Sequence, residues 1–107
     1  MAQASYREDC TTSEKSIVNS IMRYLEKLPG CYAIKTHGSV YVAGQPDLLG
    51  CYKGRMFALE VKRTGGKPTK LQQAVLKKWE AAGAIAAVVT SVEEVKELLG
   101  GRRDVSI

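Results

Sequence analysis

The chain has few of the residues that build disulfide frameworks and zinc sites. Its three cysteines, Cys10, Cys31 and Cys51, are an odd number, and no two of them form a C-x-x-C pair. This pattern gives no support to a disulfide-stapled fold or a cysteine-ligated zinc site, and it favours a reducing compartment. We interpret the three side chains as small apolar fillers with free thiols.

Long apolar runs are also missing. No segment approaches the roughly 20 apolar residues of a membrane span, and the first ten residues include acidic side chains where a secretion signal would have an apolar stretch. There is no internal repeat and no low-complexity segment. We therefore expect a cytoplasmic protein without membrane contact, located in the bacterial host cell if it is encoded by a virus.

Size and charge narrow the class further. With 107 residues, 45% of them hydrophobic, the chain is predicted to form one domain over 1–107, with a core at about 13–99 and flexible ends at 1–10 and 100–107. The net charge of +5 comes from 16 Lys and Arg against 11 Asp and Glu. A basic surface of this kind fits a polyanion such as nucleic acid, but charge alone does not distinguish DNA, RNA or an acidic membrane.

Apolar periodicity predicts the order of the elements. A helix is expected from Ser13 to Leu28, because apolar residues recur at helical spacing until Pro29-Gly30. Residues 31–36 are typical of a strand, and 37–46 fit either a loop or a strand with a bulge. Residues 47–52 and 56–62 are predicted to form a β-hairpin around the glycine-containing connection 53–55.

The second half of the chain is predicted to alternate helix and strand. Thr69 can cap a helix that runs to about Ala82 and stops at Gly83. Its expected inward face comprises Leu71, Gln72, Val75, Leu76 and Trp79. The apolar run 84–89 indicates a buried strand, and a capping box at 91–94 opens a last helix that ends at Leu99. The sequence thus predicts an α/β sandwich, with the order helix–β–β–β–helix–β–helix around a central mixed sheet.

The hairpin is where charged residues meet a buried strand. Both faces of 56–62 are apolar until Glu60, and an ionised glutamate at the end of a buried strand needs a paired charge or a metal ion. Lys62 follows on the same face, about 7 Å along the backbone. Asp47 begins the first hairpin strand, so antiparallel pairing should place it beside Glu60.

Two neighbouring carboxylates repel each other unless a cation lies between them. Oxygen ligands favour Mg²⁺ or Mn²⁺ over zinc, and the backbone carbonyl of Val61 could supply a further oxygen. Such a metal can polarise a phosphate and lower the pKa of a bound water, while Lys62 can orient that water or offset charge in the transition state. These residues predict a phosphodiesterase site. The competing interpretation is an ordinary surface ion pair between Glu60 and Lys62.

The motif Pro46-Asp47 followed by Glu60-Val61-Lys62 resembles the PD-(D/E)xK nuclease superfamily. The wider layout is similar to its VRR-NUC branch, the virus-type replication and repair nucleases, from about Ser13 to Leu99. The likeness includes Gly38, Gly44-Gln45-Pro46-Asp47, the Thr69 to Gln72 spacing and Gly83. It implies a restriction-endonuclease-like fold and a Mg²⁺- or Mn²⁺-dependent nuclease.

The resemblance also implies roles for individual residues. Asp47 and Glu60 would bind metal, Lys62 would assist the water, and Glu14 matches a first-helix glutamate that adds to the metal site. Glu14 could instead complete a capping box with Thr11. A glutamine in the helix after the E-x-K motif would support the site: Gln72 is favoured because it shares the inward face, with Gln73 as the alternative.

Residues around this motif are candidates for nucleic-acid binding. The segment 62–70 is basic, flexible and adjacent to the site, which suits contact with a phosphate backbone. Tyr41 could be a core residue, a dimer contact or a base-stacking platform. The candidate contacts are Arg63, Lys67, Lys70, Lys35 and His37.

The leading hypothesis is a DNA endonuclease selective for branched, flapped or four-way junction DNA, acting in replication, recombination or repair of a virus or phage. Cutting a junction requires two active sites, which predicts a homodimer. The alternative is a basic nucleic-acid-binding module that uses the same fold without cleaving.

Overall fold

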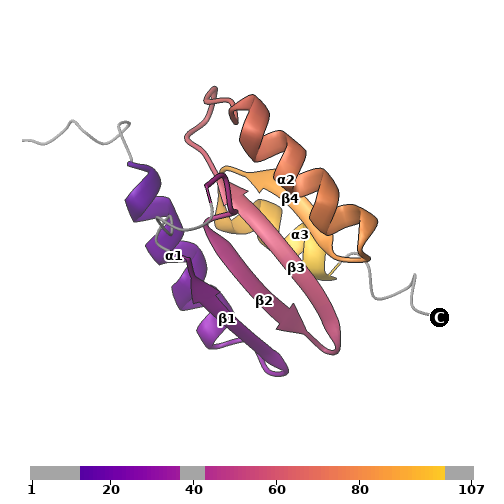
Figure 1. The fold of residues 1–107 in the computed structure, drawn as a ribbon. Helices are drawn as coiled ribbons and strands as arrows, with labels where there is room; N and C mark the ends of the chain where they lie inside the picture. Colours follow the sequence, from indigo (N-terminus) through magenta and orange to yellow (C-terminus); the bar gives the residue numbers. More distant parts are fainter. Residues whose placement is uncertain (1–12, 37–42, 101–107) are drawn as a thin grey trace, which may run out of the picture.

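The computed structural model describes residues 13–36 and 43–100. It contains helices and strands in the predicted order (Figure 1). The elements are α1 (Glu14–Glu26), β1 (Cys31–Lys35), β2 (Leu48–Tyr52), β3 (Arg55–Val61), α2 (Lys70–Ala81), β4 (Ile85–Val89) and α3 (Val92–Gly100). The last helix thus includes Gly100, which the sequence assigned to the tail.

The strands form one mixed sheet in the order β1-β2-β3-β4. The first three strands are antiparallel, whereas β4 lies parallel to β3. A parallel neighbour requires a crossover connection, and α2 provides it. The predicted mixed α/β sheet is therefore confirmed, and β3 occupies an interior position where both of its edges are paired.

Helices pack against the sheet from two sides (Figure 1). Alternate residues of β3, namely Phe57, Leu59 and Val61, are 0% exposed and join a core with residues of α1 and α3. Helix α2 packs on β3 and β4, where its Val75 and Leu76 are buried. Because Ala58 on the intervening positions is also 0% exposed, β3 is buried on both faces.

The two longer helices begin at capping residues. Ser13 is the N-cap of α1, and its hydroxyl accepts a hydrogen bond from the Ser16 N–H at 3.0 Å. Thr69 caps α2 as predicted, and Gly83 follows its end with a φ of 106°. One expectation about α2 is wrong: Leu71 is 51% exposed, and it contacts the segment at Gly44 and not the core.

The β2–β3 hairpin closes with a two-residue turn. Tyr52 pairs with Arg55, so the connection is Lys53-Gly54, one residue shorter than predicted. Both residues have positive φ, 48° and 86°, as a type I′ turn requires. The turn fixes the register in which Leu48 pairs with Leu59.

Within 13–36 and 43–100, none of the helices combines the length and hydrophobicity that a bilayer span requires. The described cysteines, Cys31 and Cys51, are free. The sequence predictions for Cys10, His37, Gly38 and Tyr41, and for the ends of the chain at 1–12 and 101–107, lie outside the described residues.

Candidate active site

Asp47 and Glu60 meet at the open end of the hairpin, opposite the turn. The register that pairs Leu48 with Leu59 places the preceding Asp47 across from Glu60. Asp47 lies one residue before β2, and its carboxylate Oδ2 accepts a hydrogen bond from the Val61 N–H at 2.8 Å. This bond adds one hydrogen bond to those that pair β2 with β3, and it holds the Asp47 side chain beside the strand that carries Glu60.

Among the residues that the structure describes, Glu60 is the one charged side chain that is buried. It is 2% exposed, and its Oε1 atom has no hydrogen-bond partner. Burial, the largest cause, and the neighbouring Asp47 carboxylate together raise the pKa of Glu60 from 4.5 to about 7, against the lowering effect of Lys62. A buried carboxylate with an unpartnered oxygen is costly unless a ligand completes it.

Lys62 partly offsets this cost. Its Nζ atom lies 3.5 Å from Glu60 Oε2, and the lysine lowers the pKa of Glu60. The Lys62 side chain is 14% exposed, so the pair is enclosed and is not an ordinary surface ion pair. The backbone N–H of Lys62 donates to Val89 O at 3.0 Å, and this bond holds Lys62 in place one residue beyond β3. Glu60 Oε2 is therefore paired, while Oε1 still lacks a partner.

Glu14 reaches the same end of the sheet from the first turn of α1. Its Oε2 accepts from the Arg63 N–H at 3.4 Å, and its charge makes the smallest of the contributions that raise the pKa of Glu60. Among the described residues, however, no three acidic, histidine or cysteine side chains lie together as a metal-binding group. The structure groups Asp47 with Glu60 and leaves Glu14 at the margin.

The residues present still fit a divalent metal ion. Glu60 has a buried carboxylate oxygen without a partner, and the register places Asp47, a second carboxylate, across the hairpin from it. Hard oxygen donors of this kind suit Mg²⁺ or Mn²⁺. Mg²⁺ is commonly bound through one or two carboxylates and keeps several waters. Two convergent carboxylates are thus a sufficient protein contribution to such a site.

Gln72 and Gln73 both hydrogen-bond locally at the start of α2. Gln72 completes a capping box: its Oε1 accepts from the Thr69 N–H at 2.9 Å, and its own N–H donates to the Thr69 hydroxyl. The Gln73 side-chain amide donates to Pro68 O at 3.2 Å. Gln72 is the more buried of the two, as the helical spacing predicted, and its observed contacts stabilise the helix end.

The predicted nucleic-acid contacts divide into two groups. Arg63, Lys67 and Lys70 are exposed on and after the segment that leaves β3, next to Lys62. Lys35 lies across β2, at the end of β1, where it pairs with Leu48. The remaining candidate, His37, lies outside the described residues.

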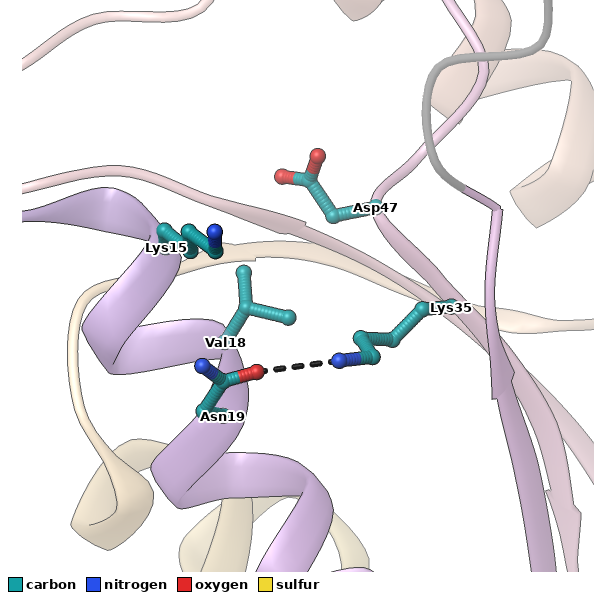
Figure 2. Close-up of a pocket in the computed structure, with 5 residues that line it drawn as sticks. All are labelled: Lys15, Val18, Asn19, Lys35 and Asp47. Atoms are coloured by element: carbon teal, nitrogen blue, oxygen red, sulfur yellow. Dashed lines mark hydrogen bonds between the residues drawn. The ribbon is translucent and has the colours of Figure 1, made fainter.

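Sequence reasoning missed a cavity beside Asp47. Its volume is about 210 Å³, and it is lined by Lys15, Val18 and Asn19 of α1 with Lys35 and Asp47 (Figure 2). Lys15 and Asn19 are four residues apart, so they share one helix face, and that spacing was the available signal. A second cavity, of about 360 Å³, lies between the segment at Gln45 and α2, where the Trp79 indole N–H donates to Gln45 Oε1 at 3.2 Å.

Comparison with known proteins finds one similar solved structure. The chain is similar to a solved structure described as a VRR_NUC domain, with a TM-score of 0.64 and 26% sequence identity, over 81% of this chain and 94% of that chain. No protein-family model and no curated protein sequence matches the chain. The fold is of the nuclease type. The resemblance to a VRR-NUC domain predicted from the sequence is confirmed by this match.

Proposed function

We propose that the chain is a Mg²⁺- or Mn²⁺-dependent DNA endonuclease whose site comprises Asp47, Glu60 and Lys62. The observation that carries this proposal is Glu60: a carboxylate 2% exposed, with one oxygen unpartnered and an aspartate opposite. A protein that only bound nucleic acid would gain nothing from burying that charge. The nuclease-type fold of the VRR_NUC domain structure supports the same conclusion.

The residues divide the chemistry between them. Asp47 and Glu60 would hold the cation, with the Val61 carbonyl as a further oxygen and Glu14 as a contributor from α1. When bound, a divalent cation polarises the phosphate and lowers the pKa of a coordinated water. The Lys62 ammonium, 3.5 Å from Glu60 Oε2, would orient the attacking water and stabilise negative charge that develops on the phosphate.

Lysines and an arginine around the site would bind the DNA backbone. The exposed basic residues near Lys62 are Arg63 and Lys67, in the segment between β3 and α2, and Lys70, the first residue of α2. Contacts of this type attach a protein to phosphates without reading sequence. We therefore propose selectivity for DNA shape, namely branched, flapped or four-way junction DNA processed in the replication, recombination or repair of a virus or phage.

A cleavage assay tests the nuclease activity. Labelled single-stranded, duplex, flap and four-way junction DNA is incubated with the protein plus Mg²⁺ or Mn²⁺, with EDTA as the metal-free control. The expected result is metal-dependent cutting that is lost in Glu60→Gln. The control Glu80→Gln, which changes an exposed glutamate outside the site, should still cut. Cutting that persists in Glu60→Gln, or in EDTA, would refute the proposed site.

Junction cleavage further implies two sites that act together. We propose a symmetric homodimer, because two strands must be cut at one junction. Light scattering with and without bound junction DNA measures the mass. A monomer in both conditions would refute the dimer and leave the single-site chemistry intact.

A further inference from the structure

The cavity in Figure 2 opens directly beside the proposed active site. It lies between the first turns of α1 and the end of β1, and Asp47 forms part of its wall. Lys15, Asn19 and Lys35 supply its other polar groups, and Val18 is the apolar lining residue. A recess that carries several polar side chains and shares Asp47 with the proposed site is a place where a second part of the substrate can bind.

Hydrogen bonding determines which way the Asn19 amide points. The Lys35 ammonium donates to Asn19 Oδ1 at 3.0 Å (Figure 2). An ammonium group has donors only, so the amide oxygen must face Lys35 and the amide nitrogen must face elsewhere. Asn19 therefore offers its two N–H donors on the side away from Lys35. The bond also holds Lys35 across the gap between β1 and α1.

The cavity consequently presents donors to a ligand. Two lysines and one asparagine line it, against the single Asp47 carboxylate. One oxygen of that carboxylate already accepts the Val61 N–H. An oxyanion is the ligand that such donors bind through charge-assisted hydrogen bonds. In the proposed reaction the cleaved phosphate must reach Asp47, Glu60 and Lys62, so this recess suits a different phosphate of the same strand.

We infer that Lys15, Asn19 and Lys35 form a phosphate subsite that binds the DNA phosphate next to the cleaved one. This inference rests on the proposed function, since it takes the substrate strand to pass Asp47. The subsite holds the backbone at a fixed distance from the carboxylates, and such positioning supports the reaction without contact with the reacting atoms. Lys15, Asn19 and Lys35 are thus positioning residues.

Neutral DNA linkages test the contact directly. Glu60→Gln protein, which leaves the DNA intact, is titrated with strands that carry one methylphosphonate at each position in turn, and anisotropy gives the Kd. Neutralising the linkage that lies in the recess is expected to weaken binding about tenfold, as the loss of a charge-assisted contact predicts. Adding Asn19→Asp or Lys15→Ala should remove most of the sensitivity to that linkage, because the contact is then already lost.

Two controls separate the subsite from general effects. Lys27→Ala removes an exposed lysine just past the other end of α1 and should keep the full sensitivity. Asn19→Asp retains an oxygen acceptor for Lys35, so it removes the amide donors while α1 and β1 stay linked. The inference is overturned if Asn19→Asp and Lys15→Ala remain as sensitive as the parent to every linkage, or if the parent does not bind DNA.

The outcome is distinguishable from failure of the nuclease proposal. Wild-type protein that never cleaves, combined with a linkage effect that Asn19→Asp removes, would refute the nuclease and support phosphate binding in the recess. Wild-type protein that cleaves, combined with unchanged linkage effects in both variants, would refute the subsite and support the nuclease.

Discussion

The two ends of the β2–β3 hairpin both carry charged residues, but only one end leaves a charge unsatisfied. At the turn, Lys53 and Arg55 are exposed, and the Arg55 Nε–H donates to Gly83 O at 3.2 Å. At the open end, Glu60 is 2% exposed and its Oε1 has no partner. At the turn end, the charged side chains are exposed to solvent, as folded proteins usually arrange them. At the open end, a carboxylate is buried without a full set of partners, and such exceptions are expected where a protein binds a ligand.

The largest effect should follow from a lysine change at the open end. Lys62→Ala is expected to reduce cleavage by about 100- to 1000-fold, the usual cost of removing one group that stabilises transition-state charge. Metal affinity should change little, because the proposed ligands Asp47 and Glu60 remain. The matched change at the turn, Lys53→Ala, should leave the rate unaltered. Single-turnover rates and metal titration by calorimetry measure both quantities, and equal loss of rate in the two variants would contradict the comparison.

A glycine between the two ends should control stability more than activity. A Cβ at Gly50 would lie 2.5 Å from the Tyr32 carbonyl oxygen and 2.5 Å from Phe57 Cζ. Gly50→Ala must therefore displace β1 backbone as well as a core ring, at a cost of about 1–3 kcal/mol. Urea unfolding provides the free energy, and an unchanged midpoint would show that this close approach is absent in solution.

The stability of the metal-free protein should depend on Glu60 and pH. The pKa of Glu60 is raised from 4.5 to about 7, so the folded chain holds the proton more tightly than the unfolded chain. The resulting stability is complete below pH 4.5 and is lost as the pH rises through 7. Glu60→Gln, which cannot ionise, should therefore be more stable than the wild type at pH 8, by about 1–3 kcal/mol.

Thermal unfolding in EDTA at pH 5 and pH 8 measures this gain. Glu80→Gln is the exposed control and should unfold like the wild type at both values. A Glu60→Gln protein that is less stable than the wild type at pH 8 would mean that the ionised carboxylate is already well paired without metal.

The smallest effect is expected at the turn. Gly54 has a φ of 86°, and a Cβ there would meet nothing within 4 Å. Gly54→Ala should thus cost only the strain of a left-handed backbone, about 1 kcal/mol. Urea unfolding of Gly54→Ala and Gly50→Ala compares the two losses of unfolding free energy. A larger loss in Gly54→Ala than in Gly50→Ala would contradict this prediction.

The sequence predicted most of the hairpin because its signals are local. The glycine-containing turn and the apolar pattern brought Asp47 near Glu60, but the predicted connection was one residue too long, and the two-residue turn sets the actual register. The Lys62–Glu60 contact followed from their spacing on one strand face. Leu71 was misplaced because helical periodicity shows which residues share a face but not which of them reach the core. The cavity at Lys15 and Asn19 was missed because it depends on α1 packing beside β1, a contact between distant segments.

The central claim is that the buried Glu60 carboxylate is completed by a divalent metal ion. Anomalous diffraction from a crystal soaked in Mn²⁺ tests it most directly. We predict a peak within coordination distance of Glu60 Oε1 and of the Asp47 carboxylate, which disappears in Glu60→Gln. A difference map without a peak between those two side chains at saturating Mn²⁺ would contradict the claim.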